Sequence, residues 1–261
     1  LQLAALGPAT TFCDGAAYLW AFLNVATTNL YATALAKQDR PVDADADAAA
    51  AAAPTPEAVV RRSAKIALVC GVASMVLILC FGRQMLGLYI GHAAASDPAL
   101  LLPATTYIKL RALSLPAALV GGVLQAALLG AKDSAAALIA IGWSTALNLA
   151  GDALLVTGLK LGLSGAAVAT AVATWASTLV LAATARRKLV SDGSLGLLPK
   201  SLFGPRRGGT AAGRSRVSNR AFLAFALPVL TLILGKIAAF GFMTHAAAGL
   251  GATSLAVHQI V

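Results

Sequence analysis

Six long runs of apolar residues, separated by polar links, form most of the chain. Each run has about 20 residues or more, the length that an α-helix needs to cross the hydrocarbon core of a bilayer. The runs are continuous and rich in Ala and Leu, whereas strands of a membrane barrel are short and alternate polar with apolar positions. The pattern predicts an all-α, polytopic membrane helix bundle with spans at 9–36, 66–91, 107–131, 135–159, 161–185 and 221–244.

Composition agrees with this prediction. Hydrophobic residues make up 59% of the chain and charged residues only 11%, whereas about a quarter of the residues in soluble domains are charged. We therefore expect an integral, multi-pass membrane protein whose first partner is the lipid bilayer.

The basic residues are distributed unevenly between the links. Most Lys and Arg residues follow the first, third and fifth runs, and the other face has only Arg83, Lys109, Arg111 and Lys160. Lys and Arg mark the cytosolic side of a membrane protein or the equivalent side of an organelle. The net charge of +10 thus mostly reflects how the chain is oriented across the membrane. Nucleic acid is not an expected partner, because no aromatic residues alternate with the basic ones.

Two polar links suggest the domain organisation. Residues 191–220, rich in Gly, Ser and Arg, are expected to be a basic linker on the cytosolic side. They divide an N-terminal lobe of five spans, 1–190, from residues 221–261, which hold the first helix of a second lobe. The low-complexity segment 39–57 is expected to be a solvated insertion. Because the chain starts at Leu1 and ends at Val261 in a predicted helix end or short loop, we expect a fragment that lacks helices on both sides.

A carboxylate lies inside the fourth apolar run. Asp152 follows Asn148 by four residues, so both side chains share one helix face. An ionised group in the middle of a bilayer costs roughly 2.5 to 3.5 kcal/mol on insertion scales, so it persists mainly where it is paired, hydrated or used. At 1.5 Å per residue, Thr170 of the next run lies at about the same depth as Asp152. Acid, amide and hydroxyl together supply only oxygen ligands, which suit a proton or Na⁺ and not a transition metal.

A purely structural explanation stays open for the Ser and Thr residues of these runs. Polar side chains in membrane helices often only hydrogen-bond neighbouring helices, and Gly165, Ala169 and Ala173 have the spacing of closely packed helices. The ionisable Asp152 in the same layer favours a function.

Longer sequence elements resemble one transporter family. These are YIKLRALSLPAALVGGVLQAALLGAKDS, then ALNLAGDALLVTGLKLGLSGAAVATAVAT, with LAALGP and VATTNLYATALAKQD before them and SLAVHQIV after them. In this order they are similar to helices two to seven of MATE (multidrug and toxic compound extrusion) transporters, especially the plant and algal DinF-like branch. The resemblance implies a two-lobed, twelve-helix, cation-coupled secondary antiporter that exports small organic molecules. It also implies that the protein is not an enzyme and makes a plastid envelope the expected compartment.

The resemblance also implies a cation site in the N-terminal lobe. Carried over by motif, its residues are Asn148, Asp152, Thr170 and Gln125. Counting the helical rise places Gln125 nearer the basic face than the other three. The coupling ion is H⁺ or Na⁺, and we expect no other cofactor, no other metal and a monomer.

Three further residues are candidates for a substrate cavity. Lys236 lies in the middle of the sixth run, too far from either end to reach water easily. It is either a counter-charge for an anionic substrate or one half of a structural ion pair. Asp14 and Tyr18 lie on one face of the first run, where they either line a cavity or contact water near the surface.

An intramembrane protease is the alternative from another functional class. Residues 162–165 read Gly-Leu-Ser-Gly, which fits the rhomboid pattern around a nucleophilic serine, here Ser164, with His245 as its base. A pattern of four residues arises easily by chance in a chain with 24 Gly. Gly151-Asp152 likewise fits only part of the aspartyl-protease pattern, because Leu149 stands where that pattern needs Gly.

Overall fold

A computed structural model describes residues 2–38, 55–91, 97–188 and 219–250 of the chain. Within these ranges every regular element is helical, as the apolar runs predict. The helices are α1 (Gln2–Tyr18), α2 (Ala21–Gln38), α4 (Pro56–Ile90), α6 (Pro98–Ala112), α7 (Leu115–Gly130), α8 (Ser134–Asp152), a π-helical segment η1 (Ala153–Gly158), α9 (Gly162–Lys188) and α11 (Asn219–Gly249).

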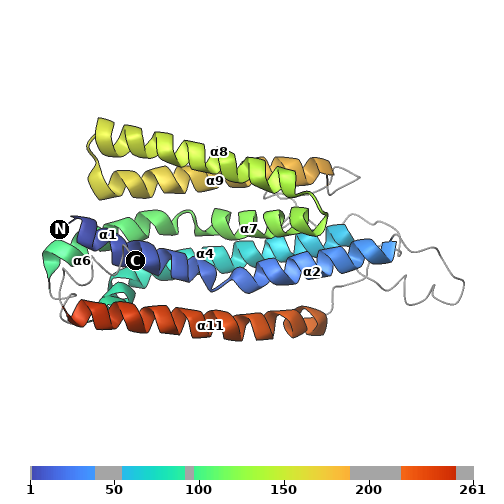
Figure 1. Ribbon diagram of the computed structural model, residues 1–261, viewed down its shortest axis with the longest axis horizontal. Helices are drawn as coiled ribbons and strands as arrows, with labels where there is room; N and C mark the ends of the chain where they lie inside the picture. The colour runs from blue at the N-terminus through green and yellow to red at the C-terminus, as the bar shows by residue number, and fades with distance from the viewer. Residues whose placement is uncertain (1, 39–54, 92–96, 189–218, 251–261) are drawn as a thin grey trace, which may run out of the picture.

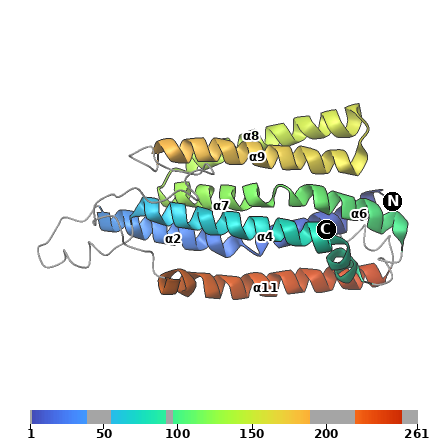
Figure 2. The same cartoon turned by 180° about the vertical axis from the view of Figure 1, so that it is seen from behind.

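The helices run nearly parallel to one long axis and form three layers. Figures 1 and 2 show α8 and α9 on one side, α1, α2, α4, α6 and α7 in the middle, and α11 on the opposite side. The turn between α7 and α8, which carries Lys132, lies at one end of the bundle. The turn between α8 and α9, which carries Lys160, lies at the other end. The three helices α7, α8 and α9 therefore alternate in direction, as membrane spans joined by short turns must.

Within the described ranges, four unbroken helices are long and apolar enough to cross a membrane, and a bent pair, α6 with α7, makes five. The expected number was six. The difference lies in the predicted span 9–36, which the structure divides into α1 and α2 around Leu19 and Trp20. The second of these helices contains Asn24, Thr27, Thr28 and Asn29 and is not among the helices that are long and apolar enough to cross a membrane.

Two helices begin earlier than hydropathy predicted, because capping residues set their starts. The second predicted span began at residue 66, but α4 begins at Pro56, where the Thr55 side chain accepts a hydrogen bond from the Ala58 backbone N–H. The third began at residue 107, but α6 begins at Pro98, after the cap Asp97. A capping side chain followed by Pro at the first helical position satisfies or removes the free N–H groups of a helix start. Lys109 and Arg111 therefore lie within a helix and not in a link.

The bend between α6 and α7 measures 49°. It falls at Leu113 and Ser114, just before Pro116, whose ring removes a backbone donor and disturbs the helix. The Ser114 backbone N–H and hydroxyl both donate to the Arg111 carbonyl, over 3.0 Å and 2.7 Å, and so reinforce the turn at the bend. On α4, Gly71 packs directly against this bend. A Cβ at Gly71 would lie 2.6 Å from the Pro116 Cα.

The tight contact at Gly71 yields a stability prediction. Gly71→Ala is expected to destabilise the protein by about 1 to 3 kcal/mol, the usual cost of forcing an extra carbon into a packed interface. Gly142→Ala on α8 is the matched control, because nothing lies within 4 Å of the added Cβ. The control is expected to be neutral, or stabilising by up to about 1 kcal/mol, since Ala favours a helix more than Gly does. Thermal unfolding of the purified protein in detergent measures both, and equal midpoints would contradict the packing argument.

Candidate functional site

The polar residues of α8 and α9 face one another, as the depth argument predicted. The Asn148 Nδ2 donates to Thr170 Oγ1 over 3.0 Å, and the Thr170 hydroxyl donates to the Ala166 carbonyl, also over 3.0 Å. The amide nitrogen of Asn148 is therefore engaged in the hydrogen bond with Thr170. The amide oxygen remains as the atom that can bind a cation or accept a hydrogen bond.

Small residues allow α8 and α9 to approach closely enough for this contact. A Cβ at Gly151 would lie 2.9 Å from the Ala169 Cβ, and a Cβ at Gly165 would lie 3.0 Å from the Leu155 carbonyl oxygen. The predicted packing residues Gly165, Ala169 and Ala173 are all buried. The close packing and the polar pair therefore belong to the same interface.

Asp152 lies one helical turn beyond Asn148 at the point where α8 changes geometry. It is the last residue of the α-helical part, and the π-helical segment η1 follows directly, with the Leu159 N–H bonded to the Leu154 carbonyl at 2.9 Å. Short π segments occur often at functional sites. The Asp152 Oδ1 is buried and has no hydrogen-bond partner among the described residues. Such an atom is rare in folded proteins, because losing water without a replacement partner is costly.

Gln125, the fourth residue of the implied cation site, is not brought to this cluster. It lies on α7 only five residues before the helix ends at Gly130, whereas Asp152 lies at the far end of α8 from the turn that joins the two helices. At 1.5 Å per residue, the two differ in depth by roughly 20 Å. No hydrogen bond joins Gln125 to Asn148, Asp152 or Thr170 in the described part of the chain. A role for Gln125 at the cation site stays a prediction without geometric support.

The three cavity candidates, Asp14, Tyr18 and Lys236, lie on the wall of one cavity of about 560 Å³ between α1, α4 and α11. The Lys236 Nζ lies 4.8 Å from the centre of the Tyr18 ring and interacts with it as a cation with a π system. Aromatic side chains make up much of the remaining wall: Phe12, Trp20, Tyr89 and Phe240. A second cation–π contact joins Lys236 to Phe240, at 5.9 Å. No carboxylate pairs with Lys236 in the ranges that the structure describes.

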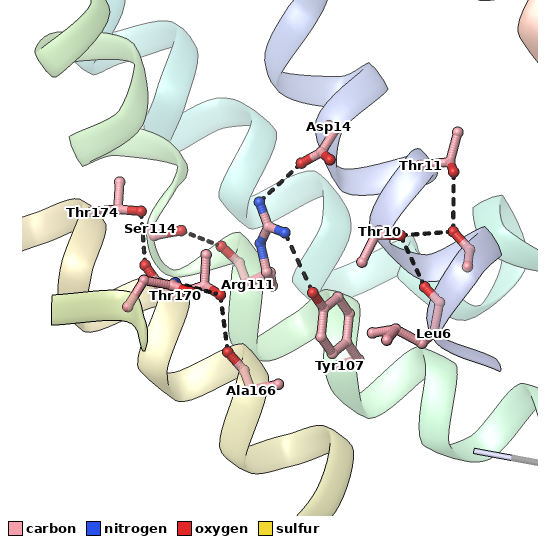
Figure 3. Close-up of polar contacts among 12 residues, drawn as sticks. Leu6, Thr10, Thr11, Asp14, Tyr107, Arg111, Ser114, Ala166, Thr170 and Thr174 are labelled. Carbon is pink, nitrogen blue, oxygen red and sulfur yellow. Dashed lines mark hydrogen bonds and ion pairs between the residues drawn. The ribbon is translucent and has the colours of Figure 1, made fainter. Parts of the chain in front are cut away.

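Arg111 is a charged residue of this region that sequence analysis counted only as a marker of orientation. Figure 3 shows its guanidinium between Asp14 of α1 and Tyr107 of its own helix. The Nη2 atom lies 3.0 Å from Asp14 Oδ1, and Nη1 donates to the Tyr107 hydroxyl over 3.3 Å. The spacing of four residues between Tyr107 and Arg111 could have indicated the second contact. The first joins residues 97 positions apart and has no local signal.

The geometry does not favour the protease alternative. Ser164 is on α9 and His245 on α11, and these two helices lie on opposite sides of the middle layer (Figures 1 and 2). The imidazole of His245 packs instead over Gly91 at the end of α4, where an added Cβ would lie 2.9 Å from its Cε1. No hydrogen bond joins Ser164 to His245 within the part of the chain that is described. A serine nucleophile needs its base within hydrogen-bond reach.

Comparison with known proteins identifies relatives along the whole chain. The family model described as MatE matches residues 54–154. Protein DETOXIFICATION 47, chloroplastic, from Arabidopsis thaliana is 33% identical over 265 residues, covering 100% of this chain and 42% of the relative. DNA damage-inducible protein F from Escherichia coli (strain K12) is 27% identical over 240 residues, covering 92% of this chain and 46% of the relative. The chain thus spans somewhat less than half the length of these relatives.

Solved structures show the same fold. An inward-facing multidrug resistance MATE family transporter of the MOP superfamily has a TM-score of 0.71 at 19% identity, covering 99% of this chain and 52% of that one. A MATE protein in the bent conformation has a TM-score of 0.69 at 20% identity, covering 98% and 51%. The sequence matches, the shared fold and the apolar helices together show that this chain is an integral, multi-pass membrane protein that belongs to the MATE family.

Proposed function

We propose that this chain carries the ion-coupling lobe of a cation-driven secondary antiporter, which exports small organic molecules. The single observation that carries the proposal is the buried Oδ1 of Asp152, which lacks a partner beside the hydrogen-bonded pair Asn148 and Thr170. Membership in the MATE family supports efflux transport as the activity, and the geometry supports the coupling step.

Asp152 has the chemistry that a coupling residue needs. Its buried oxygen can gain a proton, or it can bind a small hard cation such as Na⁺, and either event satisfies an atom that otherwise has no partner. The Asn148 amide oxygen and the Thr170 hydroxyl supply further oxygen donors from the same interface. H⁺ and Na⁺ both fit this donor set, and a thiolate- or imidazole-preferring metal does not.

The cation site and the cavity lie on different sides of the middle layer. Asp152, Asn148 and Thr170 belong to α8 and α9, whereas α11 closes the cavity from the opposite side (Figure 1). Direct contact between ion and substrate is therefore not needed. An ion that binds one conformation more tightly than the other shifts the population of conformations, and the substrate site responds through the same change.

The cavity fits a small, flat organic anion. Lys236 provides a positive charge that no described carboxylate neutralises, and aromatic rings surround it. In an apolar wall, a single ammonium attracts a negatively charged group more strongly than it would in water. We propose that the protein acts as a monomer. A plastid envelope is the proposed location, since the Arabidopsis relative is named as chloroplastic.

The first functional prediction concerns the coupling residue. In the full-length protein, Asp152→Asn is expected to lower gradient-driven transport at least about tenfold, a loss equivalent to about 1.4 kcal/mol, because Asn neither gains nor releases a proton. Proteoliposomes with an imposed proton or Na⁺ gradient measure the rate. Asp133→Asn is the matched control, since Asp133 caps the other end of α8 and Asn caps as well as Asp does. Undiminished gradient-driven efflux by Asp152→Asn would rule out the coupling role.

The second functional prediction concerns the charge of Lys236. Lys236→Gln is expected to weaken binding of an aromatic carboxylate about tenfold, because it removes the ammonium that would face the anion. A neutral aromatic amide of the same shape should bind with little change. Lys236→Arg keeps the charge and serves as the control. Equal losses for the carboxylate and the amide would show that Lys236 only supports the cavity wall.

A further inference from the structure

Asp14 and Arg111 together decide the electrostatic character of the cavity wall. Asp14 lines the cavity and its side chain is 66% exposed, whereas the Arg111 side chain is only 20% exposed and is not part of the lining. Figure 3 shows that the Arg111 guanidinium, which comes from α6, points toward Asp14 of α1. The contact of 3.0 Å is short enough for a charge-assisted hydrogen bond.

This arrangement changes which charge an occupant of the cavity encounters. Asp14 and Lys236 are the acidic and the basic residue of the cavity lining. Alone, they would make the cavity neutral, with a carboxylate and an ammonium on its wall. Because Arg111 compensates the charge of Asp14, the charge of Lys236 remains uncompensated and the wall is positive.

The position of Arg111 is fixed by the bend between α6 and α7. Its carbonyl accepts from the Ser114 hydroxyl at 2.7 Å, and its guanidinium rests on Tyr107. The bend in turn is held by α9. Trp175 Nε1 donates to the Leu113 carbonyl over 3.2 Å, and the Thr178 hydroxyl donates to the Ala117 carbonyl over 2.8 Å. The helix that carries Thr170 thus also holds the segment that orients Arg111.

We propose that Arg111 is a specificity-determining residue of the cavity: by compensating Asp14, it makes the cavity select organic anions over organic cations. Arg111 acts through Asp14 and does not itself contact the transported molecule. The inference rests on the proposed function, since it assigns the charge selectivity of the same cavity. It assigns to the ion pair between α1 and α6 a role beyond joining these helices.

The test uses three aromatic probes of one shape and different charge: naphthoate, naphthylmethylammonium and naphthamide. Their equilibrium binding to the purified full-length protein is measured without any ion gradient, so a failure of ion coupling does not affect the result. Arg111→Gln is expected to shift the ratio of anion to cation affinity about tenfold toward the cation, the effect of one partly screened charge. Asp14→Asn is expected to shift the ratio in the opposite direction.

The double variant Arg111→Gln with Asp14→Asn is the decisive control. It removes both charges, so the pair is neutral again and the wild-type selectivity should return. Arg111→Lys keeps the charge and should also retain the wild-type ratio. Unchanged binding of naphthamide reports an intact cavity in each variant. If both single substitutions shift the ratio in the same direction, or if the double variant does not recover it, the proposal is wrong and the pair only joins α1 to α6.

If Arg111→Gln fails to fold, Asp14→Asn and Arg111→Lys still decide the matter. The proposal then requires a higher preference for naphthoate in Asp14→Asn and the wild-type ratio in Arg111→Lys. An unchanged ratio in Asp14→Asn would overturn it.

Discussion

A bilayer offers polar groups no water, and this constraint explains most of the polar contacts inside the bundle. Backbone groups are satisfied within helices. Side chains find partners on other elements: Asn148 contacts Thr170, Trp20 contacts Ser74, Arg111 contacts Asp14, and Lys236 contacts the Tyr18 ring. The buried Oδ1 of Asp152 departs from this rule within the described part of the chain. A buried oxygen without a hydrogen-bond partner is expected where a protein must bind and release an ion, because a permanent partner would occupy the binding atom.

The structure links the two candidate sites through shared helices. Thr170, Trp175 and Thr178 all lie on α9; the first contacts Asn148 of α8, and the others hold the bend between α6 and α7. The bend carries Arg111, and Arg111 contacts Asp14 on the cavity wall. A movement of α9 that follows ion binding would therefore change the hydrogen bonds at the bend. Through Arg111, the change at the bend would then alter the contact with Asp14 on the cavity wall. In the proposed antiporter, this chain of contacts would be a physical route for coupling between a cation and a substrate that do not touch.

Sequence alone predicted the features that depend on local counting. Counting residues from the shared turn matched Thr170 in depth with Asp152. The hydrogen bond of Thr170 is instead to Asn148, one helical turn away on the same face of α8. The start of α4 was missed because a Thr-Pro cap extends the helix beyond its apolar run. The break near Leu19 and Trp20 was missed because neither Pro nor Gly occurs at those two positions. The pair of Arg111 and Asp14 depends on how distant helices pack, which spacing along the chain does not encode.

The π-helical segment after Asp152 also matters for how relatives are compared. A π turn accommodates one residue more than the α-helical hydrogen-bond pattern does, so η1 can be understood as an insertion absorbed without a loop. Loss of one residue between 153 and 158 would restore the α pattern and leave Asp152 in its place. Relatives could thus differ in length by one residue at this point while their carboxylates still superimpose. An alignment of this chain with a relative should accordingly place the gap within residues 153–158, inside the apolar run, and not in the turn at Lys160.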